Sequence, residues 1–197
     1  MAWWLPLVLA VPAVAGIQGS VHDFSAQGWS GGEICVVCHT PHTGRTDVEA
    51  PLWNHEVSSA TYTLYGSNSL KATPQQPGPG GVSRLCLSCH DGTIAVDSFG
   101  GNSGGTYINP GALIGTDLSN DHPVGVAWQH QDGALLNCTN CHDIHNLDRA
   151  AYGKPLRFFS GRVECATCHD VHNDVTEVKL LRLPLAGSRL CLQCHGK

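Results

Sequence analysis

The chain has 197 residues, with 16 acidic and 11 basic side chains and a formal net charge of −5. Its Lys and Arg residues are scattered rather than clustered, so we expect no nucleic-acid partner. It contains 23 Gly and 11 Pro but only four Phe, four Tyr and five Trp. Such a composition is poorly suited to building an interior from protein side chains alone.

Residues 1–15 (MAWWLPLVLAVPAVA) form an apolar stretch that carries no charge. The stretch is too short to span a bilayer comfortably, and Ala13-Val14-Ala15 fits the small-x-small pattern that signal peptidase cleaves. We predict a signal peptide over residues 1–15 and one domain over residues 16–197, with no membrane span in the mature chain. A retained apolar arm is the alternative, because no Lys or Arg precedes the apolar run.

The element Cys-x-x-Cys-His occurs five times in the rest of the chain and uses all ten cysteines. Two thiols at this spacing can add across the two vinyl groups of one haem, and the adjacent histidine can then bind the iron. We therefore predict five covalently attached haem c groups. The attachment cysteines are Cys35, Cys38, Cys86, Cys89, Cys138, Cys141, Cys165, Cys168, Cys191 and Cys194. The proximal iron ligands are His39, His90, His142, His169 and His195.

Other uses of cysteine fit this pattern less well. Zinc sites would need the Cys-x-x-Cys units to pair, and five units cannot pair evenly. A disulfide scaffold requires neither the regular spacing nor the histidine. A redox dithiol needs only one such motif.

The five motifs are of two kinds. Three continue as Cys-x-x-Cys-His-x-x-His, at 35–42, 138–145 and 165–172, and two read Ser-Arg-Leu-Cys-Leu-x-Cys-His, at 83–90 and 188–195. Gly- and Pro-rich connections, such as residues 73–81 and 100–105, are loops by composition. We predict a mostly irregular coil with short α-helices at the haem motifs and minimal β-structure, packed around a continuous chain of haems.

The second ligand of each iron is predicted to be histidine, because the only methionine is Met1. Twelve histidines less five proximal ones leave seven candidates. Three of them, His42, His145 and His172, lie three residues after a proximal histidine, on nearly the same face of a helical turn. Such a histidine cannot reach the far side of its neighbour's haem, so we expect each to bind a different haem. The residues alone do not rank the other four, which are His22, His55, His122 and His130.

Several segments of the chain resemble the doubled-CXXCH family of exported multihaem cytochromes. The similarity is greatest to the four-haem extracellular cytochrome nanowires. It is carried by residues 22–25 (HDFS), 34–42 (ICVVCHTPH), 51–54 (PLWN), 85–95 (LCLSCHDGTIA), 121–124 (DHPV), 165–173 (CATCHDVHN) and 190–195 (LCLQCH). The extra motif at residues 138–145 departs from the four-haem pattern.

The resemblance implies a secreted protein with little regular secondary structure. It also implies His22 and His122 as distal ligands beside His42, His145 and His172, with His55 and His130 as spares. In filamentous relatives the histidine after the first motif reaches a haem of the next subunit, so the resemblance implies that His42 does so here. Head-to-tail contacts of this kind propagate into open filaments when the rotation does not close.

We therefore expect an extracellular or cell-surface electron carrier that exchanges electrons with redox partners or extracellular acceptors and polymerises into a conductive filament. A discrete periplasmic or cell-surface shuttle is the alternative. We do not expect an enzyme, because each predicted iron has two histidine ligands and no position for substrate. A multihaem oxidoreductase is the less favoured third hypothesis.

Overall fold

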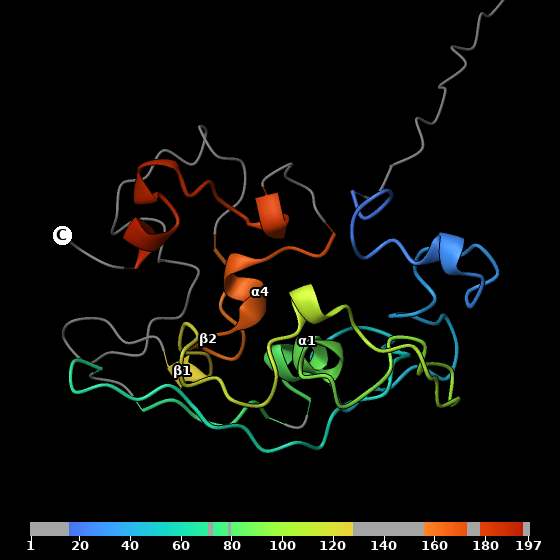
Figure 1. Cartoon of the computed structure of the whole chain (residues 1–197), viewed down its shortest axis with the longest axis horizontal. Helices are drawn as coiled ribbons and strands as arrows, with labels where there is room; N and C mark the ends of the chain where they lie inside the picture. Colours follow the sequence, from blue (N-terminus) through green and yellow to red (C-terminus); the bar gives the residue numbers. More distant parts are fainter. Residues whose placement is uncertain (1–15, 71–72, 79, 128–155, 173–177, 195–197) are drawn as a thin grey trace, which may run out of the picture.

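A computed structural model describes residues 16–70, 73–78, 80–127, 156–172 and 178–194. Over these ranges the chain is mostly loops and turns, with a few short helices and one very short sheet (Figure 1). No helix within these ranges is both long and apolar enough to cross a membrane. The elements are the α-helices α1 (Val82–His90) and α4 (Cys165–Cys168), the strands β1 (Val126–Ala127) and β2 (Arg162–Val163), and the 3₁₀-helices η1 (Ser25–Gln27), η2 (Pro110–Ala112), η3 (Val178–Leu180), η4 (Ala186–Ser188) and η5 (Cys191–Gln193).

The predicted fold class is confirmed: coil predominates, and three short helices coincide with Cys-x-x-Cys-His motifs. Helix α1 ends on His90, α4 covers Cys165–Cys168, and η5 begins on Cys191. The first motif forms only a single turn, closed by the bond from His39 N to Cys35 O at 2.8 Å. Helix α1 therefore presents both thiols and the histidine of its motif, whereas α4 contains only the two cysteines and η5 only the first cysteine.

Apolar side chains form only small clusters in the described part of the chain. One contains Tyr62, Leu87 and Leu118, and the other contains Leu181, Leu183 and Leu190. The buried Arg84 guanidinium donates to the carbonyls of Ser58, Ala60 and Pro77 beside the first cluster. This modest interior agrees with the composition, since three-residue clusters bury little apolar area.

Helices α1 and α4 lie side by side, although about 80 residues separate them (Figure 1). Ser83 joins them: its hydroxyl donates to the Glu164 carboxylate and accepts from Cys165 N at 2.9 Å. The antiparallel pair β1–β2, with Val126 opposite Val163, lies beside this contact. It follows Gly125, whose φ of +70° and close approach to the Gln75 carbonyl leave no room for a side chain. The fold thus brings the second and fourth motifs together.

Candidate haem sites

The proximal histidines of the first, second and fourth motifs each make the same kind of hydrogen bond. In each case Nδ1 donates to a backbone carbonyl: His39 to Pro51 at 2.7 Å, His90 to Ala112 at 2.9 Å, and His169 to Lys179 at 2.9 Å. A bond at Nδ1 fixes the ring orientation and the tautomer with a bare Nε2, which is how metal-binding histidines are usually held. All three are therefore arranged to bind a metal through Nε2.

Apolar side chains stand exposed beside these histidines. Leu52 is 50% exposed and follows Pro51, while Leu113 and Ile114 are 49% and 44% exposed and follow Ala112. Val171, two residues after His169, is 39% exposed. An apolar macrocycle held at the motif would remove such surface from water, which is favourable.

The first and fourth motifs are secured by the same three-bond pattern, which we call the clamp. In the first motif, residues 51–54 form it: Pro51 O accepts from the His39 ring, Leu52 O accepts from Thr40 N at 2.9 Å, and Asn54 N donates to Cys38 O at 2.9 Å. Leu52 has a φ of 53°, a left-handed conformation that is uncommon for a residue other than glycine.

Residues 179–182 form the same clamp on the fourth motif. Leu180 O accepts from Asp170 N at 2.7 Å, Arg182 N donates to Cys168 O at 2.8 Å, and Leu180 has a φ of 57°. The final residue of each clamp also donates its side chain to the residue after the first cysteine: Asn54 Nδ2 to Val36 O at 2.5 Å, and Arg182 Nε to Ala166 O at 2.9 Å. Sequence reasoning missed both clamps; the only available signal is a leucine 11 to 13 residues after the proximal histidine.

Histidine rings from distant segments of the chain approach one another in two places. The His39 and His172 centroids are 6.3 Å apart with an interplanar angle of 19°, and the His22 and His90 centroids are 6.1 Å apart at 44°. Metal–imidazole bonds of roughly 2.0–2.1 Å, as known for zinc, plus roughly 1.1 Å from nitrogen to ring centre, place two axial rings roughly 6.3 Å apart. Both centroid separations therefore match the distance expected for one metal between two imidazoles.

His22 is largely buried, and its environment favours the neutral ring. Burial, followed by the nearby His90 and His169, lowers its pKa to about 4. The neutral imidazole is the form that binds metals. Within the described part of the chain, His22 Nδ1 and the Trp53 indole N–H beside His39 are buried without a hydrogen-bond partner. Buried polar atoms of this kind are rare and suit sites that complete themselves with a bound group.

The other described candidates differ in their surroundings. His42 is exposed on a loop, and His122 is exposed with its Nδ1 3.1 Å from the Pro123 carbonyl. His55, named as a spare, is buried: its Nδ1 lies 2.8 Å from Glu56 O, and its Nε2 lies 3.1 Å from Ala95 O, 3.2 Å from Val96 O and 3.7 Å from Cys89 Sγ. His55 therefore ties chain segments together in this conformation.

One premise about the Cys-x-x-Cys-His-x-x-His spacing was wrong. Helix α4 ends at Cys168, and His169 is extended with φ −105° and ψ 148°, so His172 does not share a helical face with it. The chain leaves the helix at the proximal histidine, because Asp170 N bonds to the clamp rather than back into the helix. The extended exit carries His172 to His39, across 133 residues of sequence.

The cysteines of different motifs lie close together. The pKa of the Cys86 thiol is raised by its hydrogen bond to Cys165 and by burial. Burial, followed by the nearby Cys38 and Asp91, raises the pKa of Cys89 to about 12. The pKa of Cys168 is likewise raised by burial, then by Cys165 and Cys191. The second motif therefore adjoins the first and the fourth, and the fourth adjoins the fifth.

No disulfide joins any two of seven described cysteines, which are Cys35, Cys38, Cys86, Cys89, Cys165, Cys168 and Cys191. Several predicted site residues lie outside the described residues, as does the predicted leader: Cys138, Cys141, His142, His145, His195 and the spare His130. Their roles remain predictions.

Residues 159–197 match the family model described as "Doubled CXXCH motif". The match covers the fourth and fifth motifs, of which the fourth has the clamp and the carbonyl-bound histidine described above. It supports a multihaem c-type cytochrome. No curated protein matches this chain. Its Cys-x-x-Cys-His motifs indicate covalently bound c-type haem, and electron transfer is the function that such haems suggest. The carbonyl-bound histidines, the exposed apolar side chains and the two unpartnered buried nitrogens all fit haem.

Proposed function

We propose that this cytochrome carries five haem c groups, each held between two histidines, and transfers electrons outside the cytoplasm. The observation that supports this most is the approach of histidine rings from distant segments, with centroids 6.1 and 6.3 Å apart. Bound haem supplies a reversible one-electron iron couple, and the chain's residues fix its position and ligands. Two imidazoles on each iron leave no position for a substrate, so the protein is not an enzyme in this proposal.

We propose specific partners for two of the proximal histidines. His172 serves the iron of His39, and His22 serves the iron of His90. The remaining distal positions belong to His42, His122 and His145, which serve the irons of His142, His169 and His195 in an order left open. Each distal histidine then comes from a segment far from the motif that it completes, so ligation ties the loops of the chain to one another.

The proposed electron path follows the contacts between cysteines. Cys38 lies by Cys89, Cys86 by Cys165, and Cys168 by Cys191. Thioether bonds at these positions would hold the haems of the first, second, fourth and fifth motifs in that spatial order. Neighbouring attachment points favour short edge-to-edge distances, which a continuous electron path requires.

We further propose that the secreted cytochrome polymerises head to tail, with His42 binding a haem of the adjacent subunit at the cell surface or beyond. The exposed loop that carries His42 suits donation to a neighbour. A ligand given to the next copy makes a heterologous contact, which can extend without limit. The filament would exchange electrons with redox partners or extracellular acceptors along its length.

Cryo-electron microscopy of the exported protein tests assembly and ligation together. We expect filaments in which density for each iron joins two histidines, and a His42→Ala variant that retains its haems but stays monomeric. Wild-type protein that runs only as a monomer in size-exclusion chromatography, without filaments on grids, would favour the discrete shuttle. Stoichiometric binding of carbon monoxide by the reduced protein would instead favour an enzyme.

A further inference from the structure

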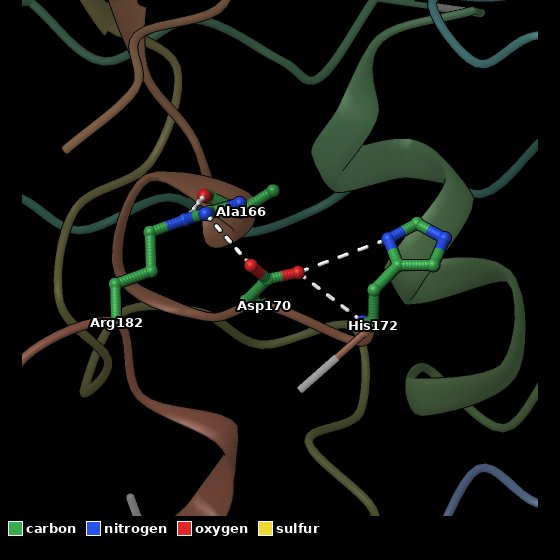
Figure 2. Close-up of polar contacts among 4 residues, drawn as sticks. All are labelled: Ala166, Asp170, His172 and Arg182. Atoms are coloured by element: carbon green, nitrogen blue, oxygen red, sulfur yellow. Dashed lines mark hydrogen bonds and ion pairs between the residues drawn. The ribbon is translucent and has the colours of Figure 1, made fainter. Parts of the chain in front are cut away.

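A buried ion pair links the fourth motif to His172. Arg182 Nη1 lies 3.0 Å from Asp170 Oδ2, and both side chains are only 7% exposed. The same guanidinium donates through Nε to Ala166 O, inside the Cys-x-x-Cys loop. Figure 2 shows Arg182 between Ala166 and Asp170, with His172 on the far side of the carboxylate. The pair therefore holds the Asp170 side chain in one place relative to the motif.

The clamp itself does not need this pair. In the first motif the same backbone positions are occupied by Thr40 and Asn54, and Asn54 alone makes the side-chain bond to the Cys-x-x-Cys loop. A buried ion pair is costly to desolvate and contributes little net stability compared with apolar residues. Because the fourth motif has this ion pair and the first does not, the pair must have a role other than closing the clamp.

The second oxygen of Asp170 points toward His172. Oδ1 accepts from His172 N at 3.2 Å and lies 3.7 Å from His172 Nδ1 (Figure 2). The latter separation is that of an ion pair, roughly 0.5–1 Å longer than an N–H···O hydrogen bond. With Nδ1 facing the carboxylate, the other side of the ring is presented to a metal, and the ring is nearly parallel to His39.

We infer that Asp170 is a positioning residue for His172 as an iron ligand, and that Arg182 fixes Asp170 for this task. The inference rests on the proposed pairing of His172 with His39. Carboxylates commonly accept the second ring N–H of a metal-bound histidine, which sets its orientation and makes it a stronger donor. A stronger donor stabilises the ferric iron, so Asp170 lowers the reduction potential of the haem attached at Cys35 and Cys38.

The test compares Asp170→Asn with the wild-type holoprotein by potentiometric titration and low-temperature paramagnetic resonance. We expect the potential of one haem to rise and its low-spin signal to shift, with the mass of attached haem unchanged. The Asp170→Glu variant keeps a carboxylate and should restore much of the wild-type potential. The matched control is Asp47→Asn, which breaks the exposed ion pair between Arg45 and Asp47, whose side chains are 45% and 65% exposed.

A second variant tests the inference if Asp170→Asn folds poorly. The Asp170→Thr/Arg182→Asn double variant copies Thr40 and Asn54 of the first clamp. It removes the ion pair and keeps residues that can form the backbone and side-chain bonds of the clamp. A titration and resonance spectrum of a fully loaded variant that superimpose on those of wild type would overturn the inference. A five-coordinate iron in the wild type would instead overturn the proposed function, which separates the two failures.

Discussion

At the scale of single residues, the partners of the two imidazole nitrogens distinguish a histidine that can bind metal from one that joins backbone segments. The described proximal histidines direct Nδ1 to a carbonyl and leave Nε2 to bind metal, whereas both nitrogens of His55 lie within hydrogen-bond distance of backbone carbonyls. Burial alone does not distinguish the roles, because His22 is also largely buried but keeps a nitrogen without a partner. The partner of each ring nitrogen is therefore the more informative observation.

This difference predicts opposite results for two substitutions. His172→Ala should leave one iron five-coordinate, giving a high-spin signal and binding of one carbon monoxide per reduced chain. His55→Ala should lower the free energy of unfolding by about 1–3 kcal/mol, because buried carbonyls lose their donor, while all irons stay low-spin. A high-spin centre in the His55 variant, or none in the His172 variant, would reverse the two assignments.

At the scale of elements, the sequence predicts the motifs and their helices but not the clamps. Cysteine spacing is read directly from the chain, and it is sufficient to locate α1, α4 and η5. The clamps depend on left-handed backbone at Leu52 and Leu180, a conformation that leucine rarely adopts and that the spacing of a leucine from the proximal histidine does not reveal. The proximity of His172 to His39 could not be predicted from the sequence either. The motif spacing indicates that His172 does not bind the haem of its own motif, but it does not identify the haem that His172 binds.

The clamp predicts a specific loss on Asn54→Ala. The substitution removes the donor to Val36 O, so the free energy of unfolding should fall by about 1–3 kcal/mol. Denaturant unfolding of the holoprotein measures this. The control is Asn102→Ala, whose amide makes only a 3.4 Å bond within an exposed loop and whose loss should cost less than about 0.5 kcal/mol. If the two substitutions lowered the free energy of unfolding equally, the clamp would not stabilise the motif.

The contact between α1 and α4 predicts a pH dependence through Glu164. Burial raises the pKa of this carboxyl above its ordinary value of 4.5, although the Ser83 hydrogen bond opposes the shift. The folded protein therefore holds the proton more tightly than the unfolded chain. This contribution to stability is complete below pH 4.5 and is lost as the pH rises through the folded pKa.

Glu164→Gln keeps an acceptor for Ser83 but cannot titrate. Unfolding curves at pH 4.5 and pH 7.5 should therefore differ less for the variant than for wild type. The same difference in both proteins would show that Glu164 is not the group responsible.

At the scale of the whole molecule, the described part of the chain has two small apolar clusters and very little regular structure. The composition predicted this, since Gly and Pro are abundant and aromatic residues are few. Covalent haem would supply most of the missing buried surface. Folding and haem attachment should then be coupled, as metal binding is in small metalloproteins.

This coupling predicts that residues 16–197, made in a cytoplasm that does not attach haem, are not stably folded. Limited proteolysis should degrade this haem-free chain under conditions that leave the holoprotein intact. Its far-ultraviolet circular dichroism should show little cooperative thermal transition. A haem-free chain that unfolds cooperatively and resists protease would mean that the protein side chains suffice.

The most direct test of the central claim is a combined measurement on protein made in a host that attaches haem c: intact mass together with low-temperature paramagnetic resonance of the oxidised form. The account predicts a mass increased by five covalently attached haems and signals from low-spin, six-coordinate iron only. Fewer than five haem additions, or a high-spin signal from an iron with one histidine, would contradict it.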